Sequence, residues 1–169
     1  MTAIDRPPVT DVLAPLRRHL IPIAVIHLVA ASVMTGVIWT MQVVHYPLLA
    51  FVGEEAFVAY EAEHVSRIGE LIALPWAVEG VTALVLVAIL PIGPLRRAAI
   101  AGVALMAVIL VATSVWSAPA HAELAEGFDA DVHRHLVSTN WVRTIAWTAR
   151  AAIATWIAVA VVRGGRTTA

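Results

Sequence analysis

The sequence contains no cysteine and no lysine. Without cysteine the chain can form no disulfide, no thiolate metal site and no thioether link to haem. Every basic residue is an arginine, so a lysine nucleophile or Schiff base is excluded. Charged residues make up only 14% of the chain and the formal net charge is −1, with no basic stripe carrying interleaved aromatic residues. We therefore expect no nucleic-acid partner.

Apolar residues, in contrast, are abundant and gather in long runs. They make up 60% of the chain, whereas soluble globular proteins contain roughly 45–50%. A helix of about 20 apolar residues crosses a ~30 Å hydrocarbon core. Four runs reach that length, and they predict an all-α, polytopic protein of the lipid bilayer, built as an up-down-up-down bundle of four transmembrane helices. The runs are Leu20–Val44, Leu71–Ile92, Ala98–Ala118 and Trp141–Val162.

The arginines are distributed unevenly about these runs. Cytoplasmic loops of membrane proteins carry an excess of arginine and lysine, which predicts the orientation of the chain in the cell inner (plasma) membrane. Both termini are then cytoplasmic, with tails at residues 1–19 and 163–169 and a transmembrane domain at 20–162. Seven arginines flank the predicted cytoplasmic side, namely Arg6, Arg17, Arg18, Arg96, Arg97, Arg163 and Arg166, and three flank the other, namely Arg67, Arg134 and Arg143.

The two predicted helical hairpins share a pattern of spacing. Phe57 precedes His64 by the same interval as Phe128 precedes His135. Tryptophan follows each histidine at an equal distance, and each hairpin turns near a glycine, Gly53 or Gly127. This pattern suggests two related helical hairpins, as internal repeats build many membrane proteins.

Five of the seven histidines fall at the outward ends of the predicted helices. Folding each hairpin at its glycine brings His45, His64, His121 and His133 to one layer. At about 100° per residue, His133 shares a helical face with Asn140 and Arg143, whereas His135 points away. The repeat alignment favours His135 instead, but buried polar groups must face partners. We therefore predict that His133 is the inward residue.

The segment "YEAEHVSRIGE" places Glu61 and His64 on one helical face. A Glu-x-x-His pair of this kind supplies ligands in ferritin-like bundles, but the fourth helix lacks a second copy, so a carboxylate-bridged di-iron site is under-supplied. The inventory suits a mononuclear zinc, copper or iron site better. Its ligands would be Glu61, His45, His64, His121 and His133. Haem b held by two histidines, or polar groups that only solvate helix ends, are the alternatives.

Two further sets of polar residues complete the prediction. Glu61 could act as a general base, and Arg143 with Asn140 could orient an anionic or carbonyl oxygen. Deeper in the second and fourth runs lie Glu79 and Arg150. Because an unpaired charge within the membrane is costly, we expect these two to form an intramembrane ion pair.

The motifs "QVVHYP" and "NWVRTIAW", within a region spanning Ile38–Arg150, resemble a group of uncharacterised bacterial four-span integral membrane proteins. The Asn-Trp-x-Arg-Thr segment is also distantly similar to anthrone-oxygenase-like membrane proteins. The resemblance implies the fold and the membrane location.

The functional prediction is a metal- or haem-dependent membrane oxidoreductase with an outward-facing His/Glu pocket for a lipophilic substrate. The alternative is a non-enzymatic subunit for transport, metal handling or assembly. A chain with four helices would then be expected to form a homo-oligomer.

Overall fold

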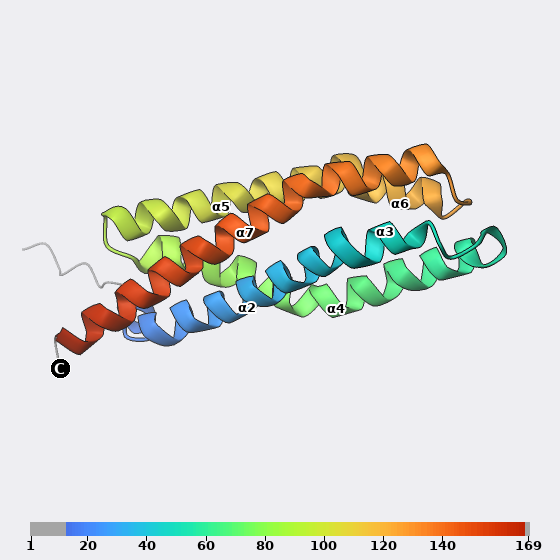
Figure 1. Cartoon of the computed structure of the whole chain (residues 1–169). Coiled ribbons are helices and arrows are strands. Elements are labelled where there is room, and N and C mark those ends of the chain that lie inside the picture. Colours follow the sequence, from blue (N-terminus) through green and yellow to red (C-terminus); the bar gives the residue numbers. More distant parts are fainter. Residues whose placement is uncertain (1–12, 168–169) are drawn as a thin grey trace, which may run out of the picture.

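The computed structural model describes residues 13–167, so most of the predicted N-terminal tail and residues 168–169 lie outside the described part. The described residues form helices and no strand. A short α1, Ala14–Arg17, leads into four long helical segments (Figure 1). These segments are α2 Leu20–Thr40 with η1 Met41–His45 and α3 Tyr46–Leu49; α4 Glu54–Ile89; α5 Pro94–Ala112 with η2 Thr113–Ser117 and α6 Ala118–Leu124; and α7 Ala130–Thr167.

The four segments form the predicted up-down-up-down bundle. α2 packs against α4 and α7, and α5 packs against the same two helices, so that α4 and α7 lie diagonally across the bundle. The turns between α3 and α4 and between α6 and α7 lie together at one end, which we call the hairpin end (Figure 1). The chain reverses there at Gly53 and Gly127, whose φ angles of 85° and 152° favour glycine.

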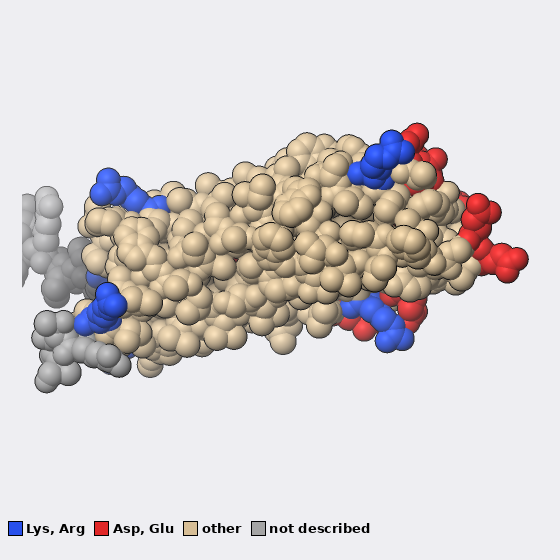
Figure 2. Space-filling view, in the orientation of Figure 1, with Lys and Arg blue, Asp and Glu red and all other residues tan. Residues whose placement is uncertain are grey.

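All four segments are long and apolar enough to cross a membrane, and the chain is a multi-pass membrane protein on that basis. The face seen in Figure 2 is uncharged along its middle, with charged side chains gathered towards its two ends. The helices are 30 to 36 residues long, longer than the predicted runs. Hydropathy marks only the part that suits hydrocarbon, whereas the polar segments Glu54–Glu70 and Ala130–Asn140 continue the same helices beyond it.

Two π-helical turns interrupt the first and third segments at matching places. η1 ends two residues before Pro47, and η2 ends two residues before Pro119. Proline cannot donate a backbone hydrogen bond, and its ring clashes with the carbonyl four residues earlier, so a wider turn accommodates it. Each π turn inserts one extra residue, which rotates the following helix by about 100° relative to an unbroken α-helix.

Residues that the repeat pattern matches also meet across the bundle. The rings of Phe57 and Phe128 lie 5.0 Å apart, and those of Trp76 and Trp147 lie 6.3 Å apart. Diagonal helices related by a two-fold axis through a bundle bring equivalent inward residues together at that axis. These contacts and the two matching π turns support the hypothesis of related hairpins.

Candidate functional site

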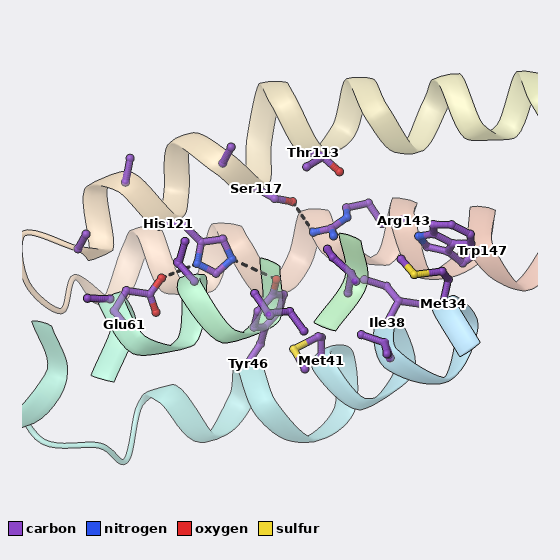
Figure 3. A pocket seen from close by; sticks show the side chains of 18 residues that line it. Met34, Ile38, Met41, Tyr46, Glu61, Thr113, Ser117, His121, Arg143 and Trp147 are labelled. Carbon is purple, nitrogen blue, oxygen red and sulfur yellow. Dashed lines mark hydrogen bonds and ion pairs between the residues drawn. The ribbon is translucent and has the colours of Figure 1, made fainter. Parts of the chain in front are cut away.

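A cavity of about 430 Å³ occupies the half of the bundle nearer the hairpin end (Figure 3). Its walls come from α2, η1, α3, α4, η2, α6 and α7, and most of the lining side chains are aliphatic or aromatic. Polar side chains reach it from all four long helical segments. The lining comprises Met34, Val37, Ile38, Met41, Tyr46, Glu61, Ala62, Val65, Ile68, Ile72, Thr113, Ser117, Ala118, His121, Ala122, Ala125, Arg143 and Trp147.

A chain of three hydrogen-bonded side chains crosses this cavity. Glu61 Oε1 lies 2.5 Å from His121 Nδ1, and His121 Nε2 lies 3.1 Å from Tyr46 Oη. The Glu61 side chain is 0% exposed. An ionised carboxylate only accepts hydrogen bonds, so these partners favour the His121 tautomer that donates from Nδ1 and accepts the tyrosine hydroxyl at Nε2. The arrangement places a base nitrogen inside an apolar cavity.

Arg143 supplies the cavity with a positive charge. Its Nη1 donates to Ser117 Oγ at 2.9 Å, and its Nε is buried without a partner. Among residues 13–167 it forms no ion pair. Figure 3 shows it between the Glu61–His121 end and the apolar end formed by Trp147, Met34 and Ile38.

The cavity opens sideways between α4 and α6. Ala62 and Val65 on α4, and Ala118 and Ala122 on α6, line the cavity and are also exposed at the protein surface. Three of these four residues are alanine, so the rim is made of small side chains.

His45 and His64 lie beside the cavity rather than in it. Their rings stack at 4.2 Å, and the ring of His64 lies 5.4 Å from that of His121. Both line a second cavity of about 380 Å³ with Tyr60, Glu63, Arg67, Ile68 and Leu71. The Nε2 atoms of both histidines and Oε2 of Glu61 are buried without a hydrogen-bond partner. Three of the four predicted histidines are thus brought together.

His133 does not join this group, which corrects the prediction of a single layer of four. It is partly buried while His135 is exposed, as the helical face predicts. However, its Nε2 donates to the backbone oxygen of Tyr46 at 2.7 Å, and its ring lies 5.5 Å from that of Phe128. In residues 13–167, no three His, Asp or Glu side chains are placed so that they could hold a metal ion as they stand.

Asn140 also lies outside the cavity, contrary to its predicted role in orienting a substrate oxygen. It is fully buried between α2 and α7, where its Nδ2 donates to Gln42 Oε1 at 2.9 Å. Thr144 Oγ1 donates to the same oxygen at 3.3 Å, and Gln42 Nε2 donates to the carbonyl of Val137. These bonds join two helices, so the structure gives Asn140 a packing role.

The predicted ion pair is present towards the other end of the bundle. Arg150 Nη2 donates to Glu79 Oε1, and Arg150 Nη1 donates to the carbonyl of Gly102. The two side chains are 1% and 0% exposed. Neither lines the cavity, from which Trp147 separates them, with the Arg150 guanidinium 5.5 Å from the centre of its ring.

Tyr46 is the site residue that sequence reasoning missed. By the spacing of an unbroken α-helix, Gln42 and His45 would share one face of the first helix. Because η1 is a wider π turn, the residues that face inward are instead Gln42 and Tyr46, both buried. Thr113 and Ser117, separated by the same four positions across η2, likewise line the cavity while Ser114 does not. The only sequence signal for both shifts is the following proline.

Comparison of the chain with protein-family models, with curated proteins and with solved structures finds no match to any of them.

Proposed function

We propose that the protein is a membrane enzyme of the oxidoreductase class that removes a proton from a lipophilic substrate. The observation that carries this proposal is the hydrogen-bonded chain Glu61–His121–Tyr46 inside an apolar cavity. Buried carboxylate–imidazole pairs are a recurring means of general base catalysis, because the carboxylate orients the ring and stabilises the imidazolium that forms.

In this mechanism His121 Nε2 accepts the substrate proton. The tyrosine hydroxyl that occupies Nε2 in the structure moves aside, or it passes its own proton to Nε2 and takes the substrate's. The negative charge of Glu61 lies 2.5 Å from Nδ1 and compensates the new positive charge. The carbanion or oxyanion left on the substrate is stabilised by Arg143, which faces the same cavity.

A copper or iron ion, when bound, would supply the electron-accepting half of an oxidation, whereas zinc, which has no redox chemistry, would only polarise a substrate oxygen. The candidate ligands of the metal ion are Nε2 of His45, Nε2 of His64 and Oε2 of Glu61, because these three atoms are buried without another partner. The three side chains would have to turn towards one another to bind it, since they are not placed to hold a metal ion in the structure. Two imidazoles and a carboxylate suit zinc, copper or iron. Haem b fits less well, since His45 and His64 stack at 4.2 Å and leave no space for a porphyrin between their rings. His121 is a poorer ligand because both its nitrogens are engaged.

The location in the cell is part of this proposal. The arginine distribution supports the cell inner (plasma) membrane with both termini cytoplasmic, so that the cavity lies in the outward half of the bilayer. The resemblance to anthrone-oxygenase-like membrane proteins agrees with an oxidoreductase for lipophilic substrates, but the proposal does not depend on it. The alternative is a non-enzymatic transport, metal-handling or assembly subunit, for which the same cavity would be only a binding site.

Comparison of membrane lipids tests the enzymatic proposal and requires no assumption about the structure of the substrate. Cells producing the wild-type protein, Glu61→Gln or His121→Asn would be extracted and their lipophilic compounds compared by mass spectrometry. We expect a compound that is formed with the wild type and is absent with both variants. His135→Asn, which changes an exposed histidine near the same end, is the matched control and should behave as wild type. Equal profiles for all four proteins would reject an enzyme and favour the binding subunit.

The metal is tested separately on the purified protein. Metal content and the visible absorption spectrum should show one bound zinc, copper or iron that is lost in His45→Asn and His64→Asn and retained in His135→Asn. A Soret band would establish haem instead. Protein that contains neither after purification and reconstitution would confine the proposal to proton transfer.

A further inference from the structure

The cavity contains a cation that no carboxylate of the described residues neutralises by contact. Arg143 presents five N–H donors, of which Nη1 has Ser117 Oγ as its acceptor while Nε is buried without one. Within residues 13–167, the one carboxylate that lines the same cavity is Glu61, which is bonded to His121. Burying a charged group inside a membrane protein costs free energy unless the group meets an opposite charge or strong hydrogen-bond acceptors.

The arginine buried in the other half of the bundle, Arg150, meets more partners than Arg143, although its Nε is also buried without one. Arg150 meets the carboxylate of Glu79 and the carbonyl of Gly102, and Trp147 covers its face. Arg143 meets the hydroxyl groups of Ser117 and Tyr46 in place of a carboxylate, and it faces open space in place of packed side chains. An oxygen of a molecule bound in that space would give Arg143 the hydrogen-bond acceptor that the carboxylate of Glu79 gives Arg150.

The remaining walls define the body of that molecule. Beyond Arg143 the cavity is bounded by Trp147, Met34 and Ile38 (Figure 3), and its α4 wall carries aliphatic side chains. Methionine side chains adapt to ligands of varied shape. A volume of about 430 Å³ is within the range of small-molecule sites, and the opening between α4 and α6 leads sideways to the protein surface.

We propose that the cavity binds a lipophilic anion, with its carboxylate or phenolate oxygen on Arg143 and Ser117 and its hydrocarbon body against Trp147, Met34 and Ile38. The molecule enters sideways between α4 and α6. This inference rests on the proposed function for the identity of the site, since it names the substrate class, but it concerns binding and not turnover.

A brominated probe tests the binding directly, because bromine quenches a tryptophan that it contacts and Trp147 lines the cavity. The protein in lipid nanodiscs would be titrated with 11-bromoundecanoate, or with 11-bromoundecanol as its uncharged match, at about pH 9, where a carboxyl group is ionised. We expect saturable quenching that favours the acid over the alcohol by about tenfold or more, the effect of one charge-assisted hydrogen-bonded contact. Trp147→Phe should remove the saturable part.

Variants separate the cavity from the surface. Arg143→Gln should abolish the preference for the acid while leaving the alcohol unchanged, and Arg143→Lys should retain part of it. Arg67→Gln removes the same charge from an exposed arginine that pairs with Glu63 outside this cavity, and it should bind both probes as wild type does. Equal binding of acid and alcohol by the wild type would overturn the inference. So would a loss of preference in Arg67→Gln as large as that in Arg143→Gln.

The two proposals fail independently. Glu61→Gln should keep the preference for the acid, because Arg143 supplies it, while it abolishes product formation. If the preference exists but Glu61→Gln still forms product, the proton-transfer mechanism is wrong and the ligand class stands. If product formation depends on Glu61 but the wild type does not distinguish the probes, the ligand class is wrong and the mechanism stands.

Discussion

Two buried carboxylates on the same helix, Glu61 and Glu79, have opposite surroundings. Both side chains are 0% exposed. Glu79 accepts a hydrogen bond from Arg150, whose guanidinium also donates to the carbonyl of Gly102. Glu79 does not line the cavity that Glu61 lines. Glu61 is bound by a histidine and lines an open cavity. The Glu79–Arg150 pair lies outside the cavity, whereas the Glu61–His121 pair has open space beside its imidazole ring.

This difference distinguishes a structural pair from a candidate catalytic one. A permanent ion pair locked by packing holds helices together but cannot easily exchange a proton. A carboxylate–histidine pair beside a cavity can instead exchange a proton with a bound molecule, because a neutral imidazole has one nitrogen that accepts a proton. Trp147 is the boundary between the two, since it lines the cavity and lies under the Arg150 guanidinium.

The largest expected effect on stability comes from the buried ion pair of Glu79 and Arg150. Glu79→Gln leaves the buried charge of Arg150 without its partner, which typically costs about 3–5 kcal/mol. We expect a matching loss in the free energy of unfolding, or a protein that no longer folds, measured by denaturation in detergent and by the yield of folded protein.

The charge-swapped double variant, Glu79→Arg with Arg150→Glu, is the control for this prediction. It restores opposite charges at the two positions and should recover much of the loss. A Glu79→Gln protein as stable as the wild type would show that the pair does not hold the bundle together.

A smaller effect is expected at the hydrogen-bonded join between α2 and α7. Asn140→Ala removes the Nδ2 donor from Gln42 Oε1 in a fully buried place. Thr144 Oγ1 can still donate to that oxygen, so the cost is one lost hydrogen bond together with the space left by the deleted side chain. The free energy of unfolding should fall by about 1–3 kcal/mol. Product formation per folded molecule should stay near that of the wild type. A loss of product without a loss of stability would return Asn140 to the site.

Glu61→Gln sharpens the comparison because it should hardly change stability. The amide keeps one hydrogen bond to His121, and the lost Oε2 atom had no partner. We expect the free energy of unfolding to change by about 1 kcal/mol or less, against the much larger change for Glu79→Gln. A loss as large as that of Glu79→Gln would make Glu61 a structural residue like its neighbour, and the mechanism would lose its base.

The sequence predicts the fold well because each membrane-spanning helix contains a long run of apolar residues. The pairing of Glu79 with Arg150 is predictable for a similar reason, since two opposite charges at matching depth have few other partners. The site is harder to predict. The direction in which a side chain points is predicted from a regular rotation of about 100° per residue. The π turns before Pro47 and Pro119 each add one residue, so the residues after them point in a different direction from the one predicted. Tyr46 thereby replaces His45 at the cavity.

Contacts with the backbone are a second reason why the site differs from its prediction. His133 has the expected face but bonds to the carbonyl of Tyr46, and the spacing of side chains does not reveal such an acceptor. Asn140 has the expected face too, but the side chain opposite it is Gln42 rather than a cavity. Helical periodicity predicts the direction in which a side chain points, but it does not predict which groups the side chain contacts there.

The smallest expected effect lies at the exposed hairpin end, where Asp129 directly precedes α7. Its Oδ1 accepts hydrogen bonds from the backbone N–H groups of Asp131 and Val132 at 2.8 and 3.0 Å. The bonds from Val132 and Asp131 lower the pKa of the Asp129 carboxyl below its ordinary value. Because the folded pKa is the lower one, the stabilisation is complete above the ordinary carboxyl pKa of about 3.9 and is lost as the pH falls through the folded value.

Asp129→Asn keeps a capping oxygen but cannot titrate. We expect the difference in unfolding temperature between wild type and this variant to be small near neutral pH and to shrink or reverse below about pH 4. Thermal unfolding in detergent across that range measures it, and Asp131→Asn, whose side chain pairs with exposed Arg134, is the matched control. A difference that does not vary with pH would mean that the capping carboxylate contributes nothing as an anion.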